Sequence, residues 1–217
     1  MRRVFVDPEF PQRDAIEEAA SRISSGGVVV VPTDTLYGLA VNPFRNDSVA
    51  RVFEVKRRPP ERGLPLIASD AAQVSAHIGP LGSLGKTLAD RFWPGPLTLL
   101  VKAPETVSPT VTGGSPKVGV RVPADRVARA ICKACNRPIT ATSANLSGQP
   151  PTADPDEVER QFRERAHLVD LIIDVGQLAG GAPSTIVDVT GRAPVLVRPG
   201  AVSWEDIEAC LAAEHQK

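Results

Sequence analysis

Short apolar runs alternate with amphipathic segments along most of the chain. Apolar residues recur at helical spacing over about residues 13–25, and the four consecutive valines at 28–31 then predict a buried strand. Asn46 or Asp47 can cap the next helix. The alternation indicates an α/β fold with a mixed parallel and antiparallel sheet and flanking helices. The same patterns predict further strands at 66–68, 97–101, 118–122, 139–142, 171–173, 185–189 and 195–197, and further helices at 84–92, 127–134, 155–162 and 204–213.

We expect one domain over residues 1–217. This length supports a sizeable core, because 42% of the residues are apolar. No glycine-rich or charge-rich linker divides the chain, and the sequence contains no internal repeat. The basic N-terminus lacks the apolar stretch of a signal peptide, and no later run is long enough to span a membrane. We therefore expect a cytoplasmic protein with no membrane partner.

Charge and cysteine content narrow the possible partners. The 25 basic residues balance 25 acidic residues, so no overall charge draws the chain to nucleic acid or anionic lipid. Three cysteines are too few for a disulfide framework, which agrees with a reducing compartment. Cys132 and Cys135 form a C-x-x-C pair, but they close an expected helix, whereas redox pairs open one. We predict that both thiols pack in the core.

The valine strand runs directly into the polar sequence PTDT at residues 32–35. A buried strand normally ends in ordinary turn residues once its apolar faces are covered. Two threonines around an aspartate therefore favour a functional site over an ordinary turn. Tyr37 and Gly38 are expected to shape the turn that follows.

A basic segment follows the second expected helix and contains Lys56, Arg57, Arg58 and Arg62. Its prolines prevent it from continuing that helix, which predicts a rigid basic loop. The alternative is a solvated helix end that the helix dipole favours.

Further polar residues end or interrupt expected strands. The sequence ITATSANLSG places Ser143 and Asn145 after a strand, where they either bind ligand oxygens or only make turns. Arg121 lies inside an apolar strand, where a guanidinium is costly to bury unless it meets an anion. The alternative is an edge strand whose arginine reaches solvent. Ser184 and Arg198 lie at opposite ends of neighbouring expected strands.

These clusters recur in an ordered string of motifs. The string reads PTDTLYGL, K-x-R-P, FWPGPLTL, V-x-V-R-V-P, TSAN-x-SG, STIVDV and L-x-R-x-G. It closely resembles the YrdC-like family of threonylcarbamoyl-AMP synthases over residues 15 to 203. The ordered set is far more specific than any one motif.

The resemblance implies an enzyme with a concave basic cleft that converts L-threonine, bicarbonate and ATP, with Mg²⁺, into threonylcarbamoyl-AMP and pyrophosphate. The product would serve downstream tRNA threonylcarbamoyltransferase proteins, which modify the adenosine beside the anticodon. Mg²⁺ is expected mainly on the ATP phosphates rather than in a protein metal site. By resemblance, the residues that face ATP and the reaction centre are Lys56, Arg58, Ser143 and Asn145, with Arg198 also on the nucleotide.

The threonine-binding positions implied by the resemblance are Thr35, Arg121 and Ser184, with Thr33 as a neighbour. Arg121 would bind the substrate carboxylate through its planar fork. The small polar side chains would address the other end of the amino acid.

The basic loop departs from the family pattern, in which an asparagine and a proline precede a leucine. Gly63 and Leu64 stand in that region here, so Arg62 is the candidate that supplies the missing donor to ATP. The alternative is an exposed arginine that pairs loosely with Glu61. The single-domain form is expected, because longer members append a second domain that 217 residues do not accommodate.

Two other functions stay open at this stage. An RNA-binding or ribosome-maturation module of the same fold would suit a concave basic surface. However, 4% aromatic residues and zero net charge oppose tight general RNA binding and leave only weak binding of RNA or tRNA. A carbamoyltransfer domain, as in hydrogenase maturation proteins, should be flanked by acylphosphatase-like and zinc-binding modules, which this sequence lacks.

Overall fold

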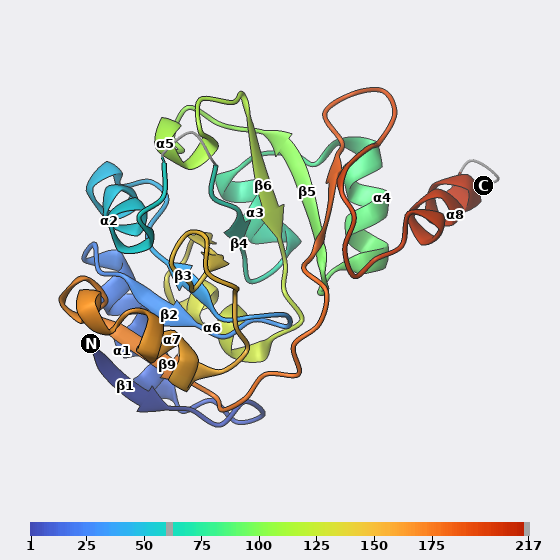
Figure 1. The fold of residues 1–217 in the computed structure, drawn as a ribbon. Coiled ribbons are helices and arrows are strands. Elements are labelled where there is room, and N and C mark those ends of the chain that lie inside the picture. The colour runs from blue at the N-terminus through green and yellow to red at the C-terminus, as the bar shows by residue number, and fades with distance from the viewer. Residues whose placement is uncertain (60–62, 215–217) are drawn as a thin grey trace.

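The computed structural model describes residues 1–59 and 63–214, and the strands in this part of the chain form two sheets (Figure 1). The first sheet has the order β1-β9-β2-β3-β8, and the second has the order β11-β10-β5-β6-β4-β7. Each combines parallel with antiparallel pairs. The strands are β1 (Arg2–Phe5), β2 (Val29–Val31), β3 (Gly38–Ala40), β4 (Leu66–Ile67), β5 (Leu97–Lys102), β6 (Lys117–Arg121), β7 (Ile139–Thr140), β8 (Thr142–Ser143), β9 (Leu171–Asp174), β10 (Thr185–Asp188) and β11 (Val195–Arg198).

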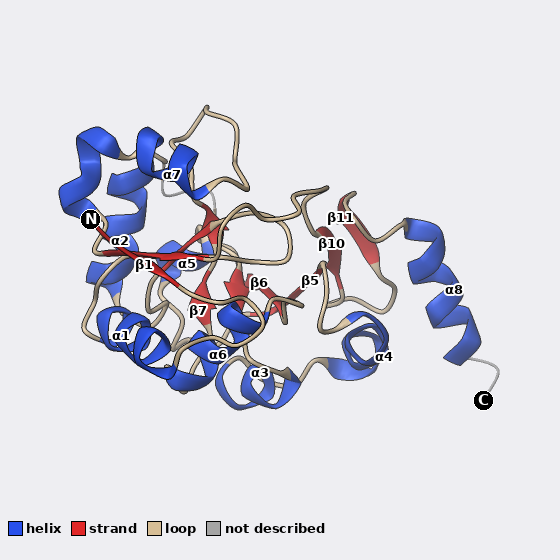
Figure 2. Ribbon diagram, turned by 90° about the horizontal axis from the view of Figure 1, so that it is seen from below, coloured by secondary structure: helices blue, strands red, loops and turns tan. Residues whose placement is uncertain are grey.

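Helices flank both sheets, so the predicted α/β fold with mixed pairing is confirmed, although the strands divide between two sheets instead of one. Figure 2 shows α1, α6, α3 and α4 along one side of the strands and α8 extending beyond α4. The helices are α1 (Arg13–Ser24), α2 (Asn46–Lys56), α3 (Ala71–His77), α4 (Gly82–Phe92), α5 (Pro109–Thr112), α6 (Arg126–Ala134), α7 (Pro155–Gln161), the 3₁₀ helix η1 (Arg163–Leu168) and α8 (Trp204–Glu214).

The valine strand β2 lies inside the first sheet. It pairs parallel with β9 and antiparallel with β3, and all of its residues are buried. A strand covered on both faces reads as a continuous apolar run, as observed here. On one side of it, the apolar face of α1 packs beside α6.

The patterns did not predict β1 and β3. The strand β1 extends the first sheet beside β9, and Arg3 forms an ion pair with Asp174 at 2.7 Å. The strand β3 has the sequence Gly-Leu-Ala, which carries no β-branched residue. Its pairing with β2 and β8 therefore comes from its tertiary surroundings.

The strand expected at 139–142 divides into two short strands that belong to different sheets. Residues of β7 pair with β4 in the second sheet, while β8 pairs with β3 in the first. Ala141 is the residue between them, and its backbone N–H donates to the carbonyl of Pro65 at 2.9 Å. The chain therefore passes from one sheet to the other at Ala141, two residues before Ser143.

The cysteines of the C-x-x-C pair lie in the core, as predicted. Cys132 and Cys135 are both buried, at the end of α6. Burial raises the pKa of both thiols, that of Cys135 to about 12, so neither is a ready thiolate. None of the helices within residues 1–59 and 63–214 has the length and apolar character of a membrane span.

Candidate active site

A cavity of about 630 Å³ lies against one face of the second sheet. Alternate residues of a strand point to the same face. Accordingly, the cavity floor includes Thr98 and Leu100 of β5 and Lys117, Gly119 and Arg121 of β6. The remaining walls include residues of the segments 33–38, 63–67, 111–115, 141–143 and 183–184.

Seven of the ten side chains predicted to form the site line this single cavity. They come from segments far apart in the sequence. Lys56 and Asn145 are buried and are not among the lining residues, and Arg62 lies outside the described residues. The seven are Thr33, Thr35, Arg58, Arg121, Ser143, Ser184 and Arg198.

The PTDT segment forms a hydrogen-bonded turn between β2 and β3. The hydroxyl of Thr33 lies 3.1 Å from that of Thr35 and 2.7 Å from the carbonyl oxygen of Leu36, to which it donates. Tyr37 is fully buried, and its hydroxyl donates to the carbonyl of Gly176 at 2.8 Å. The turn is thus anchored on both sides, and its two threonines face the cavity.

Arg121 is buried in an interior strand, since β6 lies between β5 and β4. The alternative of an edge-strand arginine reaching solvent is therefore wrong. Its Nη1 donates to Oδ1 of Asp34 at 2.5 Å, and the two side chains are only 8% and 12% exposed. The buried guanidinium meets an anion, as burial requires. The PTDT motif predicted a site at this turn, but the motif alone indicated no role for Asp34.

Ser184 and Arg198 lie next to each other at the cavity wall. The hydroxyl of Ser184 is 2.8 Å from that of Thr98 on the sheet floor. Nη2 of Arg198 donates to the Ser184 carbonyl at 2.6 Å and to its hydroxyl at 3.2 Å. Burial and the positive charge of Arg121 lower the pKa of Arg198. Two guanidinium groups therefore converge here, which favours an anionic ligand.

Arg58 brings the basic loop to the cavity. Arg57 ends α2 in a left-handed conformation with φ of 51°, which turns the chain at the end of the helix. Nη1 of Arg58 donates to the hydroxyl of Thr142 at 3.1 Å, and Nη2 donates to the carbonyl of Gly63 at 3.0 Å. The side chain of Arg58 thus lies against the cavity wall rather than on an open helix end.

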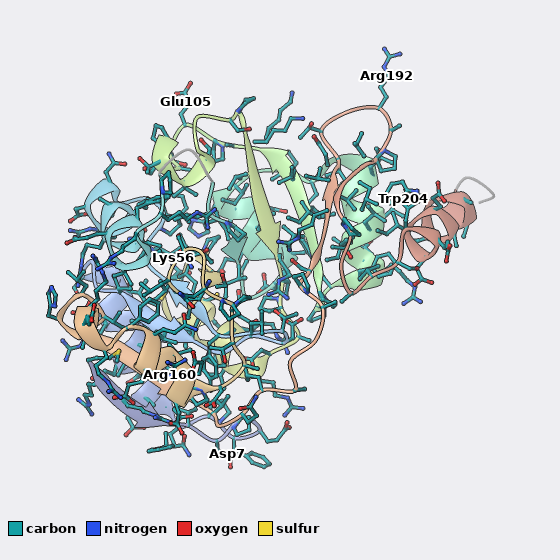
Figure 3. All side chains as sticks on the ribbon, in the orientation of Figure 1. Asp7, Lys56, Glu105, Arg160, Arg192 and Trp204 are labelled. Atoms are coloured by element: carbon teal, nitrogen blue, oxygen red, sulfur yellow. The ribbon has the colours of Figure 1, made fainter. Side chains whose placement is uncertain are left out.

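Lys56 and Asn145 lie behind that wall and bond to each other. Nζ of Lys56 donates to the carbonyl oxygen of Asn145 at 2.8 Å, to its Oδ1 at 3.0 Å and to the carbonyl oxygen of Ser143. Burial and the nearby charge of Arg58 lower the pKa of Lys56 to about 7. Figure 3 shows Lys56 within the body of the molecule, whereas Glu105 and Arg192 extend from its edge.

Lys117 is a cation of the cavity that the sequence analysis missed. It lies on the same face of β6 as Arg121, four residues earlier, and this spacing was the available signal. Its Nζ forms an ion pair with Oδ2 of Asp188 at 2.5 Å. Although burial opposes the shift, hydrogen bonds from Lys117 and Thr190 lower the pKa of Asp188.

Comparison with known proteins agrees with these motifs. The Sua5/YciO/YrdC family model, described as telomere recombination, matches residues 21–200. A threonylcarbamoyl-AMP synthase of Pyrococcus abyssi is 38% identical over 204 residues, covering 92% of this chain and 59% of the relative. One of Bacillus subtilis is 37% identical over 218 residues, covering 99% and 62%. The chain thus spans about three fifths of the length of these two relatives.

Solved structures share the fold. The structure of P. abyssi Sua5 complexed with L-threonine superposes with a TM-score of 0.90 at 36% identity, covering 97% of this chain and 61% of that one. E. coli YciO superposes with a TM-score of 0.84 at 27% identity, covering 95% of this chain and 100% of that one. The family model and both relatives support the same assignment, and this chain belongs to the Sua5/YciO/YrdC family.

Proposed function

We propose that this chain forms threonylcarbamoyl-AMP from L-threonine, bicarbonate and ATP and releases pyrophosphate. The observation that carries the proposal is the gathering of seven predicted side chains on one cavity of about 630 Å³. A cavity of this size suits a nucleotide with a small second substrate. The similarity to two threonylcarbamoyl-AMP synthases and to a threonine-bound Sua5 supports the same reaction.

The reaction needs charge and alignment rather than a protein nucleophile. The amine of threonine attacks the carbon of bicarbonate, and loss of water leaves a carbamate. A carbamate oxygen then attacks the α-phosphorus of ATP, and pyrophosphate leaves. Catalysis of this kind comes from aligning the reactants and stabilising charge on the phosphate oxygens. The guanidinium groups and hydroxyls of the cavity are suited to both tasks.

The proposed roles of the lining residues follow from their chemistry. Arg121 binds the threonine carboxylate, because Asp34 holds one of its nitrogens and its planar fork offers further donors. Thr35 and Ser184 bind the rest of the amino acid. Arg58 and Arg198 bind phosphate oxygens, and the hydroxyl of Ser143 lies on the same wall.

Mg²⁺ belongs to the proposal as an ion carried by ATP. The cavity walls in the described segments include no carboxylate, and Asp34 and Asp188 near them are ion-paired. Mg²⁺ commonly binds through substrate phosphates with few protein ligands. Such an ion would offset phosphate charge during attack.

The proposed product would be used outside this chain. In the proposal, tRNA threonylcarbamoyltransferase proteins use this product in the cytoplasm. These proteins modify the adenosine beside the anticodon. Direct contact of this chain with RNA or tRNA would be weak, because its net charge is zero.

The proposal is tested by pyrophosphate release from ATP with each substrate omitted in turn. We expect release to require both L-threonine and bicarbonate, and mass spectrometry to detect threonylcarbamoyl-AMP. Equal release without threonine would refute the proposed reaction. Purified protein with and without added Mg²⁺ tests the role of the ion.

A further inference from the structure

The ammonium group of Lys56 is saturated by protein oxygens. An ammonium group has three donors, and three acceptors surround it: the carbonyls of Ser143 and Asn145 and the side-chain oxygen of Asn145. The residue is 2% exposed and does not line the cavity. A phosphate oxygen could reach this nitrogen only if one of these hydrogen bonds were lost.

The amide of Asn145 is used in the same internal network. Its Oδ1 accepts from Lys56 and also from the hydroxyl of Ser143 at 2.6 Å. Its Nδ2 donates to the carbonyls of Leu146 at 3.0 Å and Gln149 at 2.6 Å. Both polar atoms of the amide are therefore engaged by the protein itself.

The backbone of Lys56 is tied to the same turn. Its carbonyl accepts from the N–H of Ser147 at 2.8 Å. The end of α2 thus holds the segment 143–147 through both its main chain and its side chain. Of the residues in this network, Ser143 is the one that also lines the cavity.

We propose that Lys56 and Asn145 are positioning residues that hold the turn 143–147, so that the hydroxyl of Ser143, whose proton is donated to Oδ1 of Asn145, faces the nucleotide with its oxygen lone pairs. The inference rests on the proposed function and deepens it. It divides the K-x-R and S-x-N motifs into two pairs. Arg58 and Ser143 act on the substrate side of the wall, and Lys56 and Asn145 support them from behind.

Lys56 is expected to matter because the turn 143–147 loses its organising group without the ammonium. Three oxygen acceptors converge on one point, and without a cation between them they repel one another and lose their hydrogen bonds. The turn would then move, and the Ser143 hydroxyl with it. A direct contact between Lys56 and ATP is not needed to explain a loss of activity on its replacement.

A double-mutant cycle tests the proposal. We expect Lys56→Met to lower kcat/KM by roughly 10- to 100-fold, and Ser143→Ala to lower it by a factor of its own. If Lys56 acts through Ser143, the double variant will be at least about fivefold more active than the product of the two losses predicts. If the loss of kcat/KM in the double variant equals the product of the two single losses, the proposal is overturned. Lys133→Met, at an exposed position on α6, is the matched control and should leave kcat/KM unchanged.

Nuclear magnetic resonance of the wild-type protein gives a second test, which holds even if Lys56→Met does not fold. At pH 6, which is below the pKa of about 7, the buried ammonium of Lys56 should exchange slowly with water and give a side-chain ¹⁵N signal, which saturating ATP leaves in place. A direct phosphate contact would instead change the chemical shift of this signal when ATP binds. Such a change would overturn the proposal.

The proposed reaction and the positioning role of Lys56 and Asn145 can be refuted by different results. A wild-type protein that binds ATP but makes no threonylcarbamoyl-AMP defeats the proposed reaction only. In that case the Kd of ATP replaces kcat/KM in the cycle. If ATP does not bind at all, both the reaction and the nucleotide-facing role of Ser143 are refuted.

Discussion

The carboxylate of Asp34 and the guanidinium of Arg121 form an ion pair that joins the two sheets, with 2.5 Å between Oδ1 and Nη1. Asp34 lies in the turn between β2 and β3 of the first sheet, and Arg121 ends β6 of the second. Oδ2 of Asp34 also accepts from the N–H of Ala124 at 3.2 Å. The carboxylate of Asp34 therefore connects the PTDT turn to the cavity floor.

Replacement of Asp34 by alanine should destabilise the fold strongly. It leaves the guanidinium of Arg121, which is 8% exposed, buried without its partner. Loss of one member of a buried pair costs about 3 kcal/mol or more. Urea denaturation measures the change in the free energy of unfolding.

Glu17→Ala is the control for this experiment. Glu17 forms an ion pair with Arg13 on α1, where the two side chains are 57% and 90% exposed. An exposed pair contributes about 1 kcal/mol or less. Equal effects of the two replacements would show that the Asp34–Arg121 pair does not hold the sheets together.

Arg121→Lys should weaken L-threonine binding while leaving ATP binding nearly unchanged. A lysine ammonium can still pair with Asp34, but it lacks the second arm of the fork that would hold the substrate carboxylate. We expect the Kd of threonine to rise by about tenfold or more. Calorimetric titration measures both ligands, and an unaltered threonine Kd would remove Arg121 from the amino-acid site.

The sequence predicts those parts of the fold in which the local pattern of apolar residues determines burial. The valine run at 28–31 is buried on both faces and reads directly as an interior strand. The strand β3 was missed because Gly38-Leu39-Ala40 has no intrinsic preference for it, and its partners supply the pairing.

The side-chain directions in the site could not be predicted for a similar reason. Lys56 and the oxygen atoms that hold it are 87 and 89 residues apart in the sequence. The basic composition of the loop therefore indicates a site but does not tell which cation faces the cavity. Asp34 was missed in the same way, because its partner Arg121 is 87 residues distant.

Asp125→Asn should change how stability depends on pH. Asp125 caps α6 by accepting from the N–H of Ala128 at 2.7 Å, and asparagine can keep this cap. Burial, together with the negative charge of Asp34, raises the pKa of Asp125. A carboxyl whose pKa is raised on folding binds more protons in the folded state, so its contribution to stability falls as pH rises through that range.

We therefore expect Asp125→Asn to gain melting temperature relative to the wild type between pH 3 and pH 7. At pH 3, both carboxyl and amide are neutral, and the two proteins should differ least. Thermal denaturation at both pH values measures the difference. A relative loss of melting temperature at pH 7 would show that the charged cap stabilises the protein instead.

The main chain passes very close to itself beside Ser184. A Cβ added to Gly200 would lie 2.5 Å from the backbone nitrogen of Thr185 and even nearer the carbonyl oxygen of Pro183. The N–H of Ala201 donates to this same carbonyl at 2.9 Å. Only glycine permits this approach, which brings Arg198 within hydrogen-bonding distance of Ser184.

Gly200→Ala should therefore impair both stability and the part of the cavity proposed to bind threonine. Relief of the overlap moves the segment 183–185 away from β11, at a cost of about 1–3 kcal/mol in the free energy of unfolding. The same movement separates Ser184 from Arg198, so the KM of threonine should rise more than kcat falls. Gly191→Ala is the matched control, because its added Cβ would meet its nearest neighbour, the carbonyl oxygen of Ala193, at 3.6 Å. Similar stabilities and KM values for the two variants would show that the close approach does not hold the site.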